Sequence, residues 1–135
     1  MNLDDARRYI APIAHGADAS VSWQTFDDSK AKRPELARVL HGSLSEHTRE
    51  LVRLNAAGAG IFATVNKTDL RGRRIANITA LRALFTDDDG GGLRSMPLPP
   101  SFVVHSARGP QSYWLLREGE PRERFKTAQI HLAEA

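Results

Sequence analysis

The stretch Arg82-Ala-Leu-Phe-Thr-Asp-Asp-Asp-Gly-Gly-Gly-Leu93 organises this chain of 135 residues, because an apolar run ends there in consecutive carboxylates and glycines. If the run is a strand, Asp87 and Asp89 share one face and Asp88 lies on the other. Two neighbouring carboxylates repel each other unless a cation lies between them, and hard oxygen ligands suit Mg²⁺ or Mn²⁺. By itself the stretch favours a solvated acidic turn, since Asp and Gly are the commonest turn residues. The other segments decide between the two interpretations.

The composition is that of an ordinary globular protein. The hydrophobic fraction is 41% and the charged fraction 26%, and the length suits one domain over residues 1–135. The chain has no cysteine, which excludes disulfides and thiolate metal sites. The N-terminus is acidic and no signal peptide follows, and no run approaches the ~20 apolar residues of a spanning helix. We therefore expect a cytoplasmic protein that does not bind membranes.

The excess positive charge lies in the second part of the chain. Residues 1–60 hold eight Lys/Arg and eight Asp/Glu, whereas residues 61–135 hold eleven and eight, which accounts for the net charge of +3. Four basic residues fall within eight positions: Lys67, Arg71, Arg73 and Arg74. Such a cluster near an acidic site is consistent with arginines that contact a nucleic-acid backbone. An ordinary solvated loop has the same composition.

The succession of elements predicts an α+β fold. Strands are expected at residues 19–26, 61–65, 82–87, 101–105 and 111–116, and helices at 3–15, 34–41, 43–55 and from 121 onward. Residues 77–81 suit one or two helical turns, and the apolar strand 61–65 is expected in the centre of a sheet. The last two strands form a hairpin without an intervening helix. We therefore expect a mostly antiparallel sheet with helices packed on it.

The helix over 43–55 has the clearest local signals. Ser43 and Glu46 have the spacing of a capping box, which satisfies backbone groups at a helix start. Its expected buried side consists of Leu44, Leu51, Val52 and Leu54.

A second candidate site is the turn Ser106-Ala-Arg-Gly-Pro-Gln111. Gly109 allows close approach of the backbone to a ligand, and turn amides can receive phosphate oxygens. Ser106 offers a hydroxyl, Arg108 a charge and Gln111 an amide. Any hairpin contains such residues, so the site depends on strands 82–87 and 101–106 bringing the turn beside the acidic strand end. No zinc-site, serine-hydrolase, P-loop or dinucleotide-binding pattern is present.

The order of these segments resembles the primase domain of the archaeo-eukaryotic primase superfamily, most closely its RepB-like branch of phage and plasmid primase-polymerases. The resemblance is carried by Gly58-Ala-Gly-Ile-Phe-Ala-Thr-Val-Asn66, Thr68-Asp-Leu-Arg-Gly-Arg73, Ala76-Asn-Ile78 and the acidic stretch 82–90. Residues 23–28 and 36–42 upstream, and 98–104 and 106–114 downstream, extend it over nearly the whole chain.

The resemblance implies an RRM-like core with an N-terminal α/β unit, and metal-dependent joining of nucleotides on a single-stranded DNA template. In this family the acidic pair, here Asp87 and Asp89, is catalytic and binds Mg²⁺ or Mn²⁺, two ions of which act at the α-phosphate. The implied partners are nucleoside triphosphates and a helicase or other replication protein of a phage, plasmid or mobile element. The residues implied to hold the triphosphate are Ser106, Arg108, Gly109 and Gln111.

Two features depart from the family pattern. Gln111 stands where many members carry histidine, and an amide can hydrogen-bond a phosphate but carries no proton or positive charge. The third acidic motif is expected beyond the last helix, so we expect a domain truncated at its C-terminal end. Two alternatives stay open: a non-catalytic nucleic-acid or nucleotide-binding remnant that serves as an accessory replication protein, and a metal-dependent phosphodiesterase or nuclease.

Overall fold

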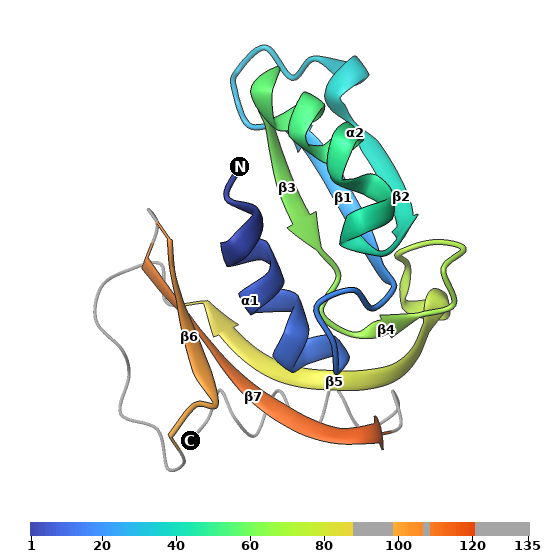
Figure 1. The fold of residues 1–135 in the computed structure, drawn as a ribbon, viewed down its shortest axis with the longest axis vertical. Coiled ribbons are helices and arrows are strands. Elements are labelled where there is room, and N and C mark those ends of the chain that lie inside the picture. The colour runs from blue at the N-terminus through green and yellow to red at the C-terminus, as the bar shows by residue number, and fades with distance from the viewer. Residues whose placement is uncertain (88–98, 107–108, 121–135) are drawn as a thin grey trace. The chain divides into compact units, whose positions relative to one another are not determined.

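The chain folds into two compact units, Met1–Thr79 (unit 1) and Ala80–Ala135 (unit 2). The structure, a computed structural model, describes residues 1–87, 99–106 and 109–120. In chain order the elements are helix α1 (Leu3–Ala14), strand β1 (Val21–Asp27), the short 3₁₀ helix η1 (Pro34–Leu36), strand β2 (Arg38–Gly42), helix α2 (Leu44–Ala56), strands β3 (Ala59–Ala63) and β4 (Lys67–Thr68), the 3₁₀ helix η2 (Ile75–Asn77), and strands β5 (Ile78–Asp87), β6 (Phe102–Ser106) and β7 (Gly109–Glu120), as drawn in Figure 1.

Unit 1 is built on a three-stranded antiparallel sheet in the order β2-β1-β3. In the central strand β1, Val21 and Trp23 on one face are buried, whereas the other face is buried at Ser22 and exposed at Phe26. Helix α2 lies against this sheet (Figure 1). On the buried face, Leu44 and Leu51 of the helix join Val21 and Trp23 in one apolar cluster. This cluster is the core of unit 1.

Helix α1 adds Ile10 and Ala14 to the same core. The side chain of Asn2 caps its start and accepts a hydrogen bond of 3.0 Å from the backbone N–H of Asp5. Pro12 lies inside the last turn, and the helix nevertheless continues to Ala14. A proline so close to the end removes one backbone hydrogen bond but leaves few residues beyond it to displace.

Helix α2 confirms the predicted capping box. The Ser43 hydroxyl accepts a hydrogen bond of 3.2 Å from the Glu46 N–H, and the Ser43 N–H donates to Glu46 Oε1 at 3.4 Å. The helix buries Leu44, Leu51 and Leu54. Val52 is 40% exposed, so its predicted place on the buried side is wrong.

Residues 38–42 form a strand where the sequence predicts a helix. Pro34 begins a single 3₁₀ turn, and the chain then pairs with β1 from Arg38 onward. The buried Thr25 fixes this change, because its hydroxyl donates to the Leu36 carbonyl at 2.7 Å and accepts from the Arg38 N–H at 3.0 Å. A segment this short is unstable as a helix, whereas strand pairing satisfies its backbone groups.

Two further expectations are corrected. Among the described strands β3 pairs only with β1, so it lies at the edge of its sheet and not in the centre. Residues 77–81 are not helical beyond η2, because β5 already begins at Ile78.

Strand β5 begins in unit 1 and continues into unit 2, within a four-stranded sheet of order β4-β5-β7-β6. Strands β6 and β7 form the predicted hairpin, and β7 is the strand that pairs with β5. The two described helices and the antiparallel β1–β2, β1–β3, β5–β7 and β6–β7 pairs confirm the α+β class. The helix predicted from residue 121 lies outside the described residues.

Candidate functional site

The acidic end of β5 lies beside β7 in the sheet of unit 2. Asp87 is the cross-strand partner of Gln111, and Gln111 is paired on its other side with Val104 of β6. Residues directly opposite each other in an antiparallel pair have Cβ atoms about 4.5–5.5 Å apart. Two residues that the sequence assigns to different candidate sites are therefore neighbours in one row of the sheet.

The end of the β6–β7 hairpin lies at the same end of this sheet. The register pairs Ser106 with Gly109, two residues beyond the row of Gln111 on each strand. Faces alternate along a strand and opposite residues share a face, so positions 87, 106, 109 and 111 belong to one face. The remaining residues of the predicted site, Asp89 and Arg108, lie outside the described residues.

A row of aromatic rings crosses the same face, two residues further into the sheet. The Tyr113 ring stacks on Phe102 with centroids 4.8 Å apart and lies 6.0 Å from the Phe85 ring. Tyr113 is buried, and its hydroxyl donates to Gln111 Oε1 at 3.2 Å. Because the amide oxygen accepts this bond, the –NH₂ of Gln111 is the group that can donate to a phosphate oxygen.

The residue types at this strand end suit a hard divalent cation, since carboxylate and amide oxygens are the ligands that Mg²⁺ and Mn²⁺ prefer. Within the described ranges no group of three or more His, Cys, Asp or Glu side chains is close enough to hold a metal ion. The structure places Asp87 by its backbone register. The metal site at Asp87 and Asp89 stays a prediction.

The basic cluster lies in unit 1, with Lys67 in β4 and its three arginines in the loop between β4 and β5. Asp69 accepts a hydrogen bond of 2.8 Å from the Arg71 N–H and two of 3.2 Å from the Asn77 side chain, whose oxygen accepts from the Arg74 N–H at 3.1 Å. The bond from the Arg71 N–H, followed by those from Asn77, lowers the pKa of Asp69. The loop is therefore ordered by its own polar groups, and the side chains of Arg71 and Arg74 are exposed.

Arg73 points back onto the sheet of unit 1. Its Nε donates to Thr64 Oγ1 at 2.7 Å and its Nη1 to Gln24 Oε1 at 3.0 Å. Partial burial lowers the pKa of the guanidinium, which still stays charged at neutral pH. Among the three arginines of the predicted nucleic-acid contact, Arg73 is therefore the one whose side chain is held by hydrogen bonds to two other side chains.

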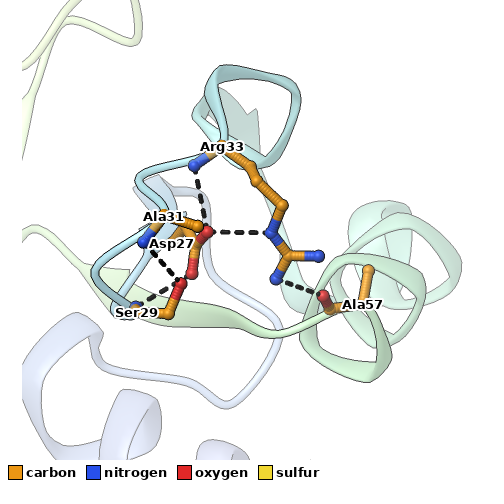
Figure 2. Close-up of polar contacts among 5 residues, drawn as sticks. All are labelled: Asp27, Ser29, Ala31, Arg33 and Ala57. Carbon is orange, nitrogen blue, oxygen red and sulfur yellow. Dashed lines mark hydrogen bonds and ion pairs between the residues drawn. The ribbon is translucent and has the colours of Figure 1, made fainter.

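A buried carboxylate organises the loop after β1 (Figure 2). Asp27 Oδ2 accepts from the Arg33 Nε at 2.8 Å and from its backbone N–H at 3.0 Å, and Oδ1 accepts from the Ser29 N–H at 2.9 Å. Arg33 also donates to the Ala57 carbonyl at 2.9 Å, just after α2. The Arg33 side chain is the main reason that the pKa of Asp27 lies well below its usual range. Both carboxylate oxygens are engaged, so this network is structural.

A serine–histidine contact that the sequence did not indicate joins β1, β2 and β4. Ser22 Oγ lies 2.8 Å from His41 Nδ1 and 2.6 Å from Thr68 Oγ1. The Ser22–His41 distance is typical of a catalytic nucleophile that is hydrogen-bonded to its general base. However, Ser22 is only 1% exposed, and a substrate could not reach its hydroxyl. The contact therefore links three strands. Only the register Ser22–His41, which follows from the unexpected strand β2, could have revealed it.

No protein-family model matches the sequence, and no curated protein or solved structure is significantly similar to the chain. None of the helices in the described part of the chain is long and apolar enough to cross a membrane.

Proposed function

We propose that the protein is a metal-dependent nucleotidyltransferase domain of the primase-polymerase type, which joins nucleotides on a single-stranded DNA template. The observation that carries this proposal is the register that pairs Asp87 with Gln111. This pairing places the acidic strand end two residues from the Ser106–Gly109 pair, on the same face of the sheet. In the resemblance, these two segments are the metal-binding and triphosphate-binding motifs.

In the proposed site each group has a separate task. Gln111 donates its amide N–H to a phosphate oxygen and is held in position by the Tyr113 hydroxyl. Ser106 and Arg108 add a hydroxyl and a positive charge, and Gly109 leaves the turn backbone accessible. When bound by Asp87 and Asp89, Mg²⁺ or Mn²⁺ would supply Lewis-acid stabilisation of charge at the α-phosphate.

The proposal includes the fold that the resemblance implies. The antiparallel sheet of unit 2 would be part of an RRM-like core, and unit 1 would be the N-terminal α/β unit. The arginine-rich loop, with Arg71, Arg73 and Arg74, would lie along the nucleic-acid backbone.

The test is template-directed incorporation of nucleotides by the purified chain, with Mg²⁺ or Mn²⁺ and a single-stranded template. Asp87→Ala and Asp89→Ala should each lower the rate of incorporation at least roughly hundredfold, as expected for the loss of a group that stabilises developing charge. Asp88→Ala is the matched control and should retain activity, because the alternation predicted from the sequence would put this acid on the other face.

Gln111→Ala should act differently, by raising the KM for the nucleotide more than it lowers kcat, since it removes a binding contact. Incorporation that survives the double substitution of Asp87 and Asp89 would refute the assignment of the site. Template binding without incorporation under either metal would instead establish the non-catalytic nucleic-acid-binding role. Cleavage of the template without incorporation would establish a nuclease.

A further inference from the structure

The sheet of unit 1 has one face that α2 does not cover. Along β1 the odd positions, such as Trp23, enter the core, whereas Gln24 and Phe26 lie on the opposite face. Gln24 is paired with Val39 of β2 and with Phe62 of β3, which places these side chains on the same face. A sheet face with large apolar side chains still in contact with solvent calls for an explanation.

Two aromatic rings on this face form a parallel pair. The Phe26 and Phe62 rings are stacked, with centroids 4.8 Å apart and planes at 2°. They are nevertheless 38% and 44% exposed. Phe26 and Phe62 come from neighbouring strands and are diagonal neighbours, since Phe26 is opposite Gly60. The pair therefore forms a flat apolar surface in contact with solvent.

Gly60 keeps the space beside the rings open. A Cβ at this position would lie 2.9 Å from a ring carbon of Phe62 and 2.5 Å from Asp28 Oδ2. A side chain at this position would therefore displace the ring or the carboxylate. The Asp28 carboxylate marks one end of the aromatic pair with negative charge.

The opposite end of the pair carries positive charge. Arg73 donates a hydrogen bond to Gln24, which is the cross-strand partner of Phe62. It donates a second hydrogen bond to Thr64, which follows Phe62 by two residues in the chain. This spacing along a strand is about 6.6–6.8 Å. Arg73 thus connects the aromatic pair to the segment 67–74, which begins with strand β4 and holds the exposed basic residues Lys67, Arg71 and Arg74.

We propose that this surface, formed by Phe26, Phe62 and the basic loop 67–74, binds single-stranded nucleic acid. Unpaired bases stack on the exposed aromatic pair, and the phosphates follow Arg73 toward the basic loop. Stacking on aromatic side chains tolerates any base, whereas bases in a duplex are already stacked and their faces are not accessible. The charge is complementary to a polyanion at the Arg73 end, and the Asp28 end directs the backbone away from itself.

This inference shares the basic loop with the proposed template contact, but it does not depend on nucleotidyl transfer, because every residue of the surface belongs to unit 1 whereas Asp87 and Gln111 belong to unit 2. The experiment therefore uses the whole chain without nucleotides and with a chelator, so that metal-dependent chemistry is absent. The probe is a fluorescent oligothymidine of roughly 20 nucleotides, long enough for a site of the size that single-strand binders cover. Its anisotropy gives the Kd over a range of salt concentrations.

Phe62→Ala should weaken binding about 5- to 150-fold, the effect of removing a base-stacking aromatic ring. Phe62→Tyr should restore it, since the ring is kept. Val52→Ala is the matched control, because Val52 is a comparably exposed apolar residue at 40% but lies on α2, and it should leave the Kd unchanged. Asp87→Ala should also leave the Kd unchanged, which separates this surface from the proposed catalytic site.

Arg74→Ala should weaken binding at low salt and reduce the slope of log K against log salt by about one, as for the loss of one phosphate contact. Equal affinity for single strands and duplex, or wild-type affinity in Phe62→Ala, would overturn the proposal. If Phe62→Ala instead changes the oligomeric state in sedimentation while the Kd stays the same, the aromatic pair is a protein contact and the proposal is wrong.

Discussion

The packing of α2 gives the sharpest test of the core of unit 1. Leu51 has no exposed surface and belongs to the cluster that contains Val21 and Trp23. Leu51→Ala leaves a cavity in this cluster. Such a substitution lowers the free energy of unfolding by about 2–5 kcal/mol in comparable cores. A domain of the size of unit 1 has a free energy of unfolding of roughly 4–12 kcal/mol. The substitution therefore removes a large part of its stability.

Val52 provides the matched control one position along the same helix. Because it is 40% exposed, Val52→Ala should change the free energy of unfolding by no more than about 0.5 kcal/mol. The higher helix propensity of alanine favours a slight gain in stability. The pair of substitutions thus differs in expected cost by roughly 2 kcal/mol or more, although the sequence pattern places both residues on the buried side.

Urea unfolding followed by far-ultraviolet circular dichroism measures the difference, because both described helices belong to unit 1. With a urea m-value of about 1–3 kcal/mol/M, a loss of about 2–5 kcal/mol in Leu51→Ala should lower the midpoint by roughly 0.7–5 M. Val52→Ala should leave it nearly unchanged. If Val52→Ala costs as much as Leu51→Ala, the helix is rotated by about one position relative to the structure, and the reasoning from its buried face fails.

Two further substitutions test the polar groups of unit 1. The folded-state pKa of Asp27 is depressed, chiefly by Arg33, so its stabilising contribution is complete above the ordinary pKa of about 3.9 and is lost as pH falls below it. Asp27→Asn should therefore be less stable than the wild type at neutral pH, and it should lose less stability between neutral pH and about pH 3. Urea midpoints along a pH series measure this, and parallel profiles for the variant and the wild type would contradict it. Ser43→Ala removes the cap of α2 and should lower the free energy of unfolding in urea by about 1 kcal/mol. Ser45→Ala in the first turn is the control and should have a smaller effect. Equal costs for the two variants would show that the cap contributes nothing specific.

The candidate site was predictable from the sequence in its parts but not in its assembly. The acidic strand end and the Ser/Gly turn are visible as local composition. Their adjacency depends on β7 pairing with β5, which makes Asp87 and Gln111 partners. Local sequence does not determine register between strands separated by more than twenty residues, because register follows from packing of the whole face. Asp89 and Arg108 lie outside the described residues, so their place in the site stays a prediction.

The surface around Phe26 and Phe62 was not visible from the sequence at all. Phe62 belongs to a run of apolar residues, which favours a core position, and the predicted strand at 19–26 does not reveal which ring lies beside Phe26. Phe62 is 44% exposed because it lies on the sheet face that α2 does not cover, as does Phe26 of the central strand β1. The anchoring of Arg73 on Gln24 likewise joins residues that are 49 positions apart.

The sequence by itself determined the α+β class, the strand at β1, the β6–β7 hairpin and the capped start of α2. Each of these rests on interactions between residues close in the chain, such as Ser43 with Glu46. The tertiary structure decided that residues 38–42 form a strand, that β3 lies at an edge and that Val52 faces solvent. In these places local preference is weak, and hydrogen bonds to a distant strand, such as those of Thr25 with Leu36 and Arg38, outweigh it.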